Sequence, residues 1–142
     1  PLPRPAPMHA LARNDDDAER RDSGSRRTVR SALLAEVDAV LSRGLASLPL
    51  DAKQRARAKS LARDAMSYFA RPAGARGTTA VHALAAAVAY AIVFVDHVPL
   101  TQSEVAACFR VSAASLRGRF GELRSHLDLT PGDARYATLR RR

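Results

Sequence analysis

Arginine side chains and the polar caps of helices carry the chemical signal in this sequence, and they concentrate toward its C-terminal end. A stretch that starts at Thr101 reads TQSEVAACFRVSAASLRGRFGEL. Thr101 and Glu104 form the capping box T-x-x-E, which opens a predicted helix over about 102–109. Ser112 opens a second predicted helix, about 113–127. Since only a tight turn separates the two, the stretch predicts a helix-turn-helix, a motif whose second helix contacts base edges in the major groove of DNA.

The second predicted helix of this motif has an apolar face and, opposite it, a face of small residues. At the helical angle of 100° per residue, the inward face consists of Leu116, Phe120 and Leu123. The outward face consists of Ala114, Gly118, Gly121 and Ser125. Arg117 and Arg124 lie on one flank and Arg119 lies on the other. Each helix-interior glycine costs about 1 kcal/mol relative to alanine, so the pair indicates either close approach to a duplex or a tight packing corner within the chain.

These positions define the DNA contacts that we expect. Four residues of helix 112–126 are expected to read bases: Ala114, Ser115, Arg117 and Gly118. Basic residues of the motif, of an earlier helix and of the C-terminus are expected to contact phosphates, which position a protein without reading sequence: Arg55, Lys59, Arg63, Arg110, Arg119, Arg124, Arg140, Arg141 and Arg142. The row at 55, 59 and 63 is equally compatible with a solvated helix face.

The net charge of the chain favours a polyanionic partner. Its 142 residues include 23 Lys and Arg against 14 Asp and Glu, which gives a net charge of +9. The excess lies in two blocks, residues 51–72 and 101–142, while residues 73–100 between them are neutral overall. Nucleic acid is therefore the first expected partner and an anionic membrane surface the second. The absence of Trp and the presence of only 4 Phe and 3 Tyr argue against a base-stacking platform for single strands.

The sequence contains no residue pattern typical of an enzyme or of a metal site. Its one cysteine, Cys108, excludes an internal disulfide or a thiolate zinc site and is expected to pack in the core. His82 is expected to be a buried histidine with its hydrogen bonds satisfied. No glycine-rich phosphate loop follows a strand, and no Ser/His/Asp arrangement occurs. We therefore expect a protein without catalytic activity or cofactor, in a reducing cytoplasm and, in a prokaryote, associated with the nucleoid.

The whole chain is predicted to be all-α, with five principal helices. The expected organisation is a flexible arm (1–27), a helical domain (28–129) that ends in the helix-turn-helix (101–127), and a short basic tail (130–142). Apolar residues at helical spacing predict three helices before the motif, at about 28–46, 52–70 and 78–95. The apolar face of the first is expected to consist of Leu33, Val37, Val40, Leu41 and Leu48, and that of the second of Ala58, Leu61, Ala65, Tyr68 and Phe69. Asp51 is the expected N-cap of the second helix. No alternating strand pattern occurs. The length suffices for one domain with a hydrophobic core.

The third predicted helix, AVHALAAAVAYAIVFV, is apolar nearly all round. A membrane span would need about 20 strongly apolar residues, whereas this run has about 17 and half of them are alanine or polar. A helix that is apolar on every side is also typical of the centre of an all-helical domain. We therefore expect this helix to form the core.

Several segments together resemble one cyclin-like repeat of the transcription factor IIB family. The matching segments are LP at 48–49, RG at 76–77, ALAAAVAY at 83–90, PLTQSEVA at 99–106 and VSAASLR at 111–117. The resemblance covers about residues 33–127. It implies a five-helix repeat that binds DNA flanking the TATA box and contacts the TATA-binding protein and RNA polymerase.

The resemblance also implies roles for single residues. In that family, the recognition helix of the second repeat reads a promoter element with a pattern like V-T-I-R, and the matching positions here are Ala114, Ser115, Leu116 and Arg117. Arg117 is therefore implied to read a base. The zinc ribbon and the second repeat of the family have no counterpart in this sequence, so we expect a DNA-binding regulator or accessory protein.

A second function remains open at this point. Cyclin folds also serve as scaffolds for protein docking, and Gly118 and Gly121 would then face a helix of a partner protein, such as a component of the transcription machinery. The expected partners are therefore double-stranded DNA or such a protein, and no membrane.

Overall fold

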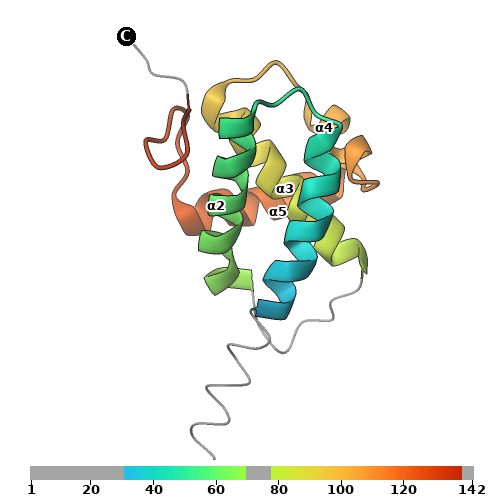
Figure 1. The fold of residues 1–142 in the computed structure, drawn as a ribbon. Coiled ribbons are helices and arrows are strands. Elements are labelled where there is room, and N and C mark those ends of the chain that lie inside the picture. The colour runs from blue at the N-terminus through green and yellow to red at the C-terminus, as the bar shows by residue number, and fades with distance from the viewer. Residues whose placement is uncertain (1–30, 70–77, 139–142) are drawn as a thin grey trace, which may run out of the picture.

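The computed structural model describes residues 31–69 and 78–138, which form five helices and no strand (Figure 1). The first described helix covers residues 31–46. The others, in chain order, are α2 (Ala52–Phe69), α3 (Thr78–Asp96), α4 (Gln102–Cys108) and α5 (Ala113–Leu127). The predicted all-α fold is confirmed. The predicted arm and the predicted start of the first helix lie outside the described residues.

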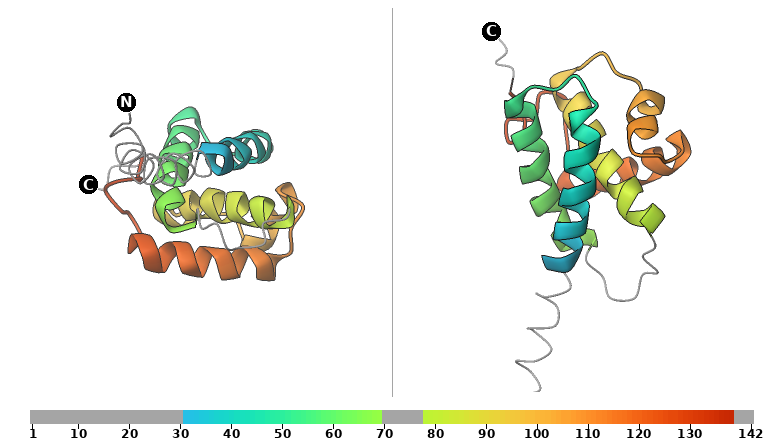
Figure 2. Two further views of the ribbon diagram at one scale, coloured as in Figure 1. Left: turned by 90° about the horizontal axis from the view of Figure 1, so that it is seen from below. Right: turned by 45° about the vertical axis from the view of Figure 1, so that its right-hand side comes forward.

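α3 lies at the centre of the fold because every side of it is apolar. Residues 85–89 are all fully buried, and consecutive residues over more than one turn cover the whole circumference of a helix. Figure 2 (left) shows α3 between two layers, with the 31–46 helix and α2 on one side and α5 on the other. The prediction that this helix forms the core is confirmed. None of the helices in the described ranges combines the length and apolarity needed to cross a bilayer.

The 31–46 helix and α2 form one layer against α3. The 31–46 helix and the loop after it bury the apolar residues predicted from their spacing: Leu33, Val37, Val40, Leu41 and Leu48. α2 buries Ala58, Leu61, Ala62, Ala65 and Met66. The predicted stripe on α2 also included Tyr68 and Phe69, whose side chains lie outside the described part of the chain. Asp51 caps α2 as predicted, because its Oδ1 accepts a hydrogen bond from the backbone N–H of Gln54 at 2.8 Å.

One close contact joins the 31–46 helix to the residue that follows α4. The ring of Phe109, a residue that is only 2% exposed, lies against the backbone of Gly44. A Cβ atom added at Gly44 would lie 2.2 Å from two of the ring carbons. Only glycine at position 44 therefore allows the helix and the ring to pack in this way.

Residues 130–138, assigned from the sequence to the C-terminal tail, pack against the helices. Tyr136 is 1% exposed, and its hydroxyl donates a hydrogen bond to Asp64 of α2. The backbone N–H of Gly132 donates to the carbonyl of Val95 at 2.8 Å, and the hydroxyl and backbone N–H of Thr138 both donate to the carboxylate of Asp96. The packed domain therefore extends at least to Thr138, beyond the predicted boundary at 129.

Asp133 and Arg135 fasten this segment to the end of α5. The guanidinium of Arg135 donates to both carboxylate oxygens of Asp133, at 3.0 and 2.8 Å, and to the carbonyl of Leu127 at 2.6 Å. The hydrogen bonds from Arg135 to the carboxylate hold the pKa of Asp133 below its ordinary value, although burial acts in the opposite direction. Burial, together with the hydrogen bond to Asp64, raises the pKa of the Tyr136 phenol. The segment is thus held by polar contacts as well as by the buried ring.

Two glycine substitutions should have opposite effects on stability. Gly44→Ala introduces a Cβ into the space of the Phe109 ring, and we expect it to lower the free energy of unfolding by about 2 kcal/mol, as overpacking does. Gly121→Ala lies inside α5, where an added Cβ meets no atom within 4 Å, so it should raise stability by up to about 1 kcal/mol. Chemical denaturation measures both changes. Equal stability of Gly44→Ala and the parent would contradict the packing described here.

The contribution of Asp133 should depend on pH. Because its folded-state pKa is lowered, the ionised carboxylate stabilises the fold fully above the unfolded-state pKa of about 4, and this contribution is lost as the pH falls through the folded-state value. Asp133→Asn should therefore have a lower Tm than the parent at pH 7, and the difference should shrink on going to pH 3. Asp38→Asn, which removes only an exposed partner of Lys59, is the control and should change the Tm little. A difference for Asp133→Asn that stays constant with pH would contradict this assignment.

Candidate nucleic-acid interface

The α4–turn–α5 unit begins each helix with the cap predicted from the sequence. The Oγ1 atom of Thr101 accepts from the backbone N–H of Glu104 at 3.1 Å, and the Glu104 carboxylate accepts from the backbone N–H of Thr101 at 3.2 Å. The Oγ atom of Ser112 accepts from the backbone N–H of Ser115 at 3.0 Å. Both predicted caps are therefore confirmed, and they fix where α4 and α5 start.

The turn between α4 and α5 is closed by backbone hydrogen bonds. The N–H of Val111 donates to the carbonyl of Ala106 at 3.1 Å, and the N–H of Arg110 donates to the carbonyl of Ala107 at 3.2 Å, the pattern of a Schellman motif. Arg110 adopts the left-handed conformation, with φ of 58°. The Nδ1 atom of His82 in α3 donates to the carbonyl of Phe109 at 3.0 Å, since a carbonyl can only accept. α3 thus anchors the turn that sets the direction of α5.

The two predicted faces of α5 are confirmed. Leu116 and Leu123 are fully buried, and the ring of Phe120 meets the rings of Tyr90 and Phe94 edge-on at centroid distances of 5.0 and 5.3 Å. The opposite face is exposed and consists of Ala114, Gly118, Gly121 and Ser125. A Cβ atom added at either glycine would meet no atom within 4 Å. Close packing against another element in the described part of the chain therefore does not require glycine at either position.

The three arginines along α5 have different partners. The Nε atom of Arg117 donates to Oε1 of Gln102 at 3.1 Å, and the guanidinium of Arg124 lies 4.9 Å from the centre of the Phe94 ring. Both partners are uncharged, so these two arginines are oriented without being neutralised. The Nη1 atom of Arg119 instead pairs with the carboxylate of Glu122 at 3.2 Å. The positive charge of α5 therefore lies mainly on the flank that holds Arg117 and Arg124.

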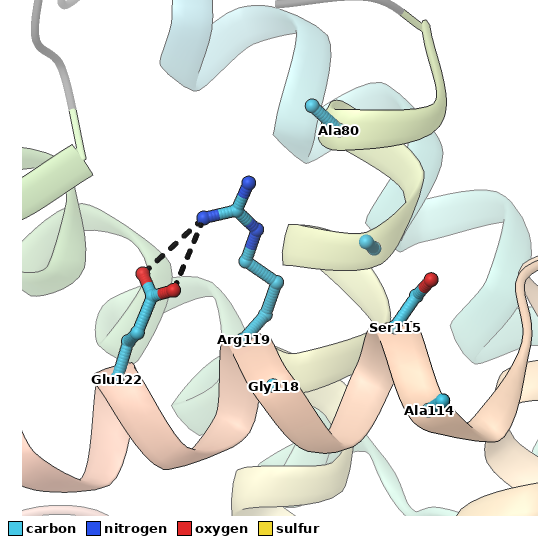
Figure 3. Close-up of a pocket in the computed structure, with 7 residues that line it drawn as sticks. Ala80, Ala114, Ser115, Gly118, Arg119 and Glu122 are labelled. Atoms are coloured by element: carbon cyan, nitrogen blue, oxygen red, sulfur yellow. Dashed lines mark hydrogen bonds and ion pairs between the residues drawn. The ribbon is translucent and has the colours of Figure 1, made fainter.

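An open groove runs along the other flank of α5, where it meets the start of α3 (Figure 3). Its volume is about 430 Å³. It is lined by Ala80 and Ala83 of α3 and by Ala114, Ser115, Gly118, Arg119 and Glu122 of α5. The groove is thus walled by small side chains, and the ion pair of Arg119 and Glu122 lies toward one end. Its lining includes Ala114, Ser115 and Gly118, which are three of the four residues that we expect to read bases.

The structure does not bring all the expected phosphate contacts together. Arg117, Arg119 and Arg124 lie on α5, and Arg110 lies exposed in the turn before it. Arg55, Lys59 and Arg63 lie on α2, in the layer on the other side of α3 (Figure 2, left). The Nζ atom of Lys59 is 3.7 Å from a carboxylate oxygen of Asp38. The C-terminal residues 140–142 lie outside the described residues.

Two residues that orient the arginines of α5 were not identified from the sequence. Gln102 opens α4 and Phe94 lies near the end of α3, and neither lies at helical spacing from the arginine that it contacts. No periodic signal could have linked them. Within residues 31–69 and 78–138, no three His, Cys, Asp or Glu side chains lie close enough to hold a metal ion.

Comparisons of the chain with models of protein families, with curated proteins and with solved structures found no match. The resemblance to a transcription factor IIB repeat therefore stays a prediction from the sequence.

Proposed function

We propose that this protein binds double-stranded DNA through the exposed face of α5 and acts in transcription as a regulator or accessory factor. The observation that carries the proposal is the pair of glycines at 118 and 121, which face open space within the described chain while Arg117 and Arg124 flank them. Each glycine costs about 1 kcal/mol of helix stability, and no contact within the described chain offsets that cost. Close approach of an external surface explains the choice of glycine.

The chemistry of this face suits the major groove. Small side chains let the helix backbone lie close to base edges, while a guanidinium can form two parallel hydrogen bonds with guanine. Ala114, Ser115 and Gly118 would lie against the bases, and Arg117 is the best placed base-reading side chain. Its bond to Gln102 fixes its direction without neutralising its charge.

The phosphate contacts would come from both sides of this face. Arg110 and Arg124 carry uncompensated charge on the turn and on α5, and Arg119 contributes less because Glu122 neutralises it. Arg55, Lys59 and Arg63 belong to α2, which lies in the layer on the other side of α3 from α5 (Figure 2, left). We therefore assign them no contact with a duplex bound to α5. We therefore propose a single contact surface rather than a clamp made of both basic blocks.

Arginine substitutions test this surface. Sequencing the bound fraction of a random duplex pool first gives the preferred site, and fluorescence anisotropy with a labelled duplex then measures Kd. Arg117→Gln should weaken the preferred site by about 1–3 kcal/mol and reduce sequence preference, whereas Arg124→Gln should weaken all duplexes about equally and lower the salt slope by about 1. Arg63→Gln, with the same loss of charge on α2, is the matched control and should change Kd little. Absence of duplex binding at about 50 mM salt would refute the proposal.

A second candidate function is the docking of a partner protein, and the small-residue groove between α3 and α5 favours it. A helix of a partner could lie in this groove against Ala80, Ala83 and Gly118. Docking of this kind would depend on the shape of the groove rather than on the charges of Arg117 and Arg124.

Two bulky substitutions separate the candidates without changing any charge. Gly121→Leu places a side chain on the exposed face outside the groove, and we expect about tenfold or more weaker duplex binding together with a more stable fold. Ala80→Leu fills the groove from α3, which should block a partner helix, and it should weaken duplex binding much less than Gly121→Leu does. Anisotropy and chemical denaturation of both variants are the measurements. If Ala80→Leu weakens duplex binding while Gly121→Leu does not, the exposed face of α5 is not the DNA-binding surface.

A further inference from the structure

A second pocket lies on the side of the turn that faces the 31–46 helix. Its volume is about 260 Å³. It is lined by Val40, Arg43 and Gly44 of that helix, His82 of α3, Cys108 of α4, and Phe109 and Arg110 of the turn. Since these residues come from three separate segments of the chain, the pocket exists only in the folded domain.

The lining of this pocket carries positive charge without a compensating carboxylate. Arg43 and Arg110 come from different elements, and no Asp or Glu lines the pocket. Within the described chain neither guanidinium has an ion-pair or hydrogen-bond partner. Two unpaired guanidinium groups beside an imidazole favour an anion, and guanidinium geometry matches the oxygens of a phosphate or carboxylate.

The conformation of Arg110 is consistent with a role for its side chain. Its φ of 58° lies in the left-handed region, at the position of a Schellman motif where glycine is preferred. Residues other than glycine, asparagine and aspartate rarely adopt this conformation, which costs about 1–2 kcal/mol. A glycine would close the turn without that cost but would remove one of the two guanidinium groups from the pocket.

The other lining residues limit the size and polarity of an occupant. Val40 and Phe109 are apolar and almost fully buried, and position 44 has no side chain. The volume is just below the range typical of pockets for drug-sized ligands. An occupant that matches this lining is small, with an oxyanion at one end and a short apolar body at the other. A recess of this kind is not needed for the phosphate of a DNA backbone, which binds on exposed surfaces.

We propose that this pocket binds a small organic anion, a phosphate or carboxylate group on a short apolar body, through Arg43 and Arg110. The site lies outside the exposed face of α5 and shares only Arg110 with the proposed phosphate contacts. Binding of the small anion does not depend on the proposed DNA binding. Val40 and Phe109 contact the apolar body, and the two guanidinium groups bind the oxyanion.

Cys108 provides a direct measure of occupancy because it is the only cysteine of the chain and lines the pocket. The probe is phenyl phosphate, and the measurement is the rate at which iodoacetamide, an uncharged reagent, alkylates the thiol. Phenyl phosphate should slow the reaction in a saturable way, by about tenfold at ten times its Kd, since only the unoccupied protein reacts. Phenol and sodium chloride at matched ionic strength should not slow it.

Substitutions test whether the protection of Cys108 by phenyl phosphate depends on Arg43 and Arg110. The double variant Arg43→Gln/Arg110→Gln should lose protection, and Arg57→Gln on α2, which removes a charge outside the pocket, should keep it. Circular dichroism checks that each variant is folded. If phenol protects as well as phenyl phosphate, or if the double variant is still protected, the proposal is wrong.

Two further experiments complete the test. The first distinguishes a small organic anion from a DNA phosphate as the source of the oxyanion, and the second does not depend on how fast the Cys108 thiol reacts. A short DNA duplex replaces phenyl phosphate in the first arm, and protection by the duplex alone would overturn the proposal in favour of a backbone phosphate contact. In the second arm, ¹H–¹⁵N NMR follows the Nε–H signals of Arg43 and Arg110 during titration with phenyl phosphate. Saturable shifts of both signals support the site, and their absence overturns it whatever the alkylation rate.

Discussion

The structure depends on the burial of α3. A helix that is apolar on every side has no face to present to water, so other elements must cover its whole circumference. The 31–46 helix and α2 cover one side and α5 covers the other (Figure 2, left). This requirement fixes which face of α5 turns inward, because Leu116, Phe120 and Leu123 meet α3. The small-residue face of α5 is therefore exposed as a consequence of how α3 is buried.

The same requirement separates the two basic blocks of the chain. Both have a net charge of +4, but α2 belongs to one layer and α5 belongs to the other. A sum of charges along the sequence cannot show this, since net charge describes how strongly a polyanion is attracted and not where it binds. The net charge of the chain therefore corresponds to two separate basic surfaces. One is on α5, where we propose that a duplex binds, and the other is the basic row on α2.

The features of this fold that could be predicted from the sequence are those that depend on residues close together in the chain. Helix spans follow from apolar spacing over a few turns, and caps follow from residues three apart, as at Thr101 and Glu104 or at Asp51 and Gln54. Contacts between distant residues leave no such signal. Tyr136 and Asp64 are separated by 72 residues, and a segment with few apolar residues gave no reason to expect a buried ring there. The pairing of Arg117 with Gln102 and the pocket around Arg43 and Arg110 also depend on tertiary packing. The expected site residues could therefore be chosen from the sequence, but the groups that orient them could not.

Three residues of the α4–turn–α5 unit lower the stability of its backbone conformation, and no contact within the unit offsets this loss of free energy. Gly118 and Gly121 weaken the interior of α5, and Arg110 holds a left-handed conformation that glycine would adopt freely. Gly44 is different, because there the absence of a Cβ is what admits the Phe109 ring. Folding alone favours alanine at 118 and 121 and glycine at 110. Gly118 and Gly121 face open space and Arg110 lines a pocket, so no contact within the described chain explains these three choices. This contrast with Gly44 is the reason why we propose α5 and its turn as the surfaces that bind other molecules.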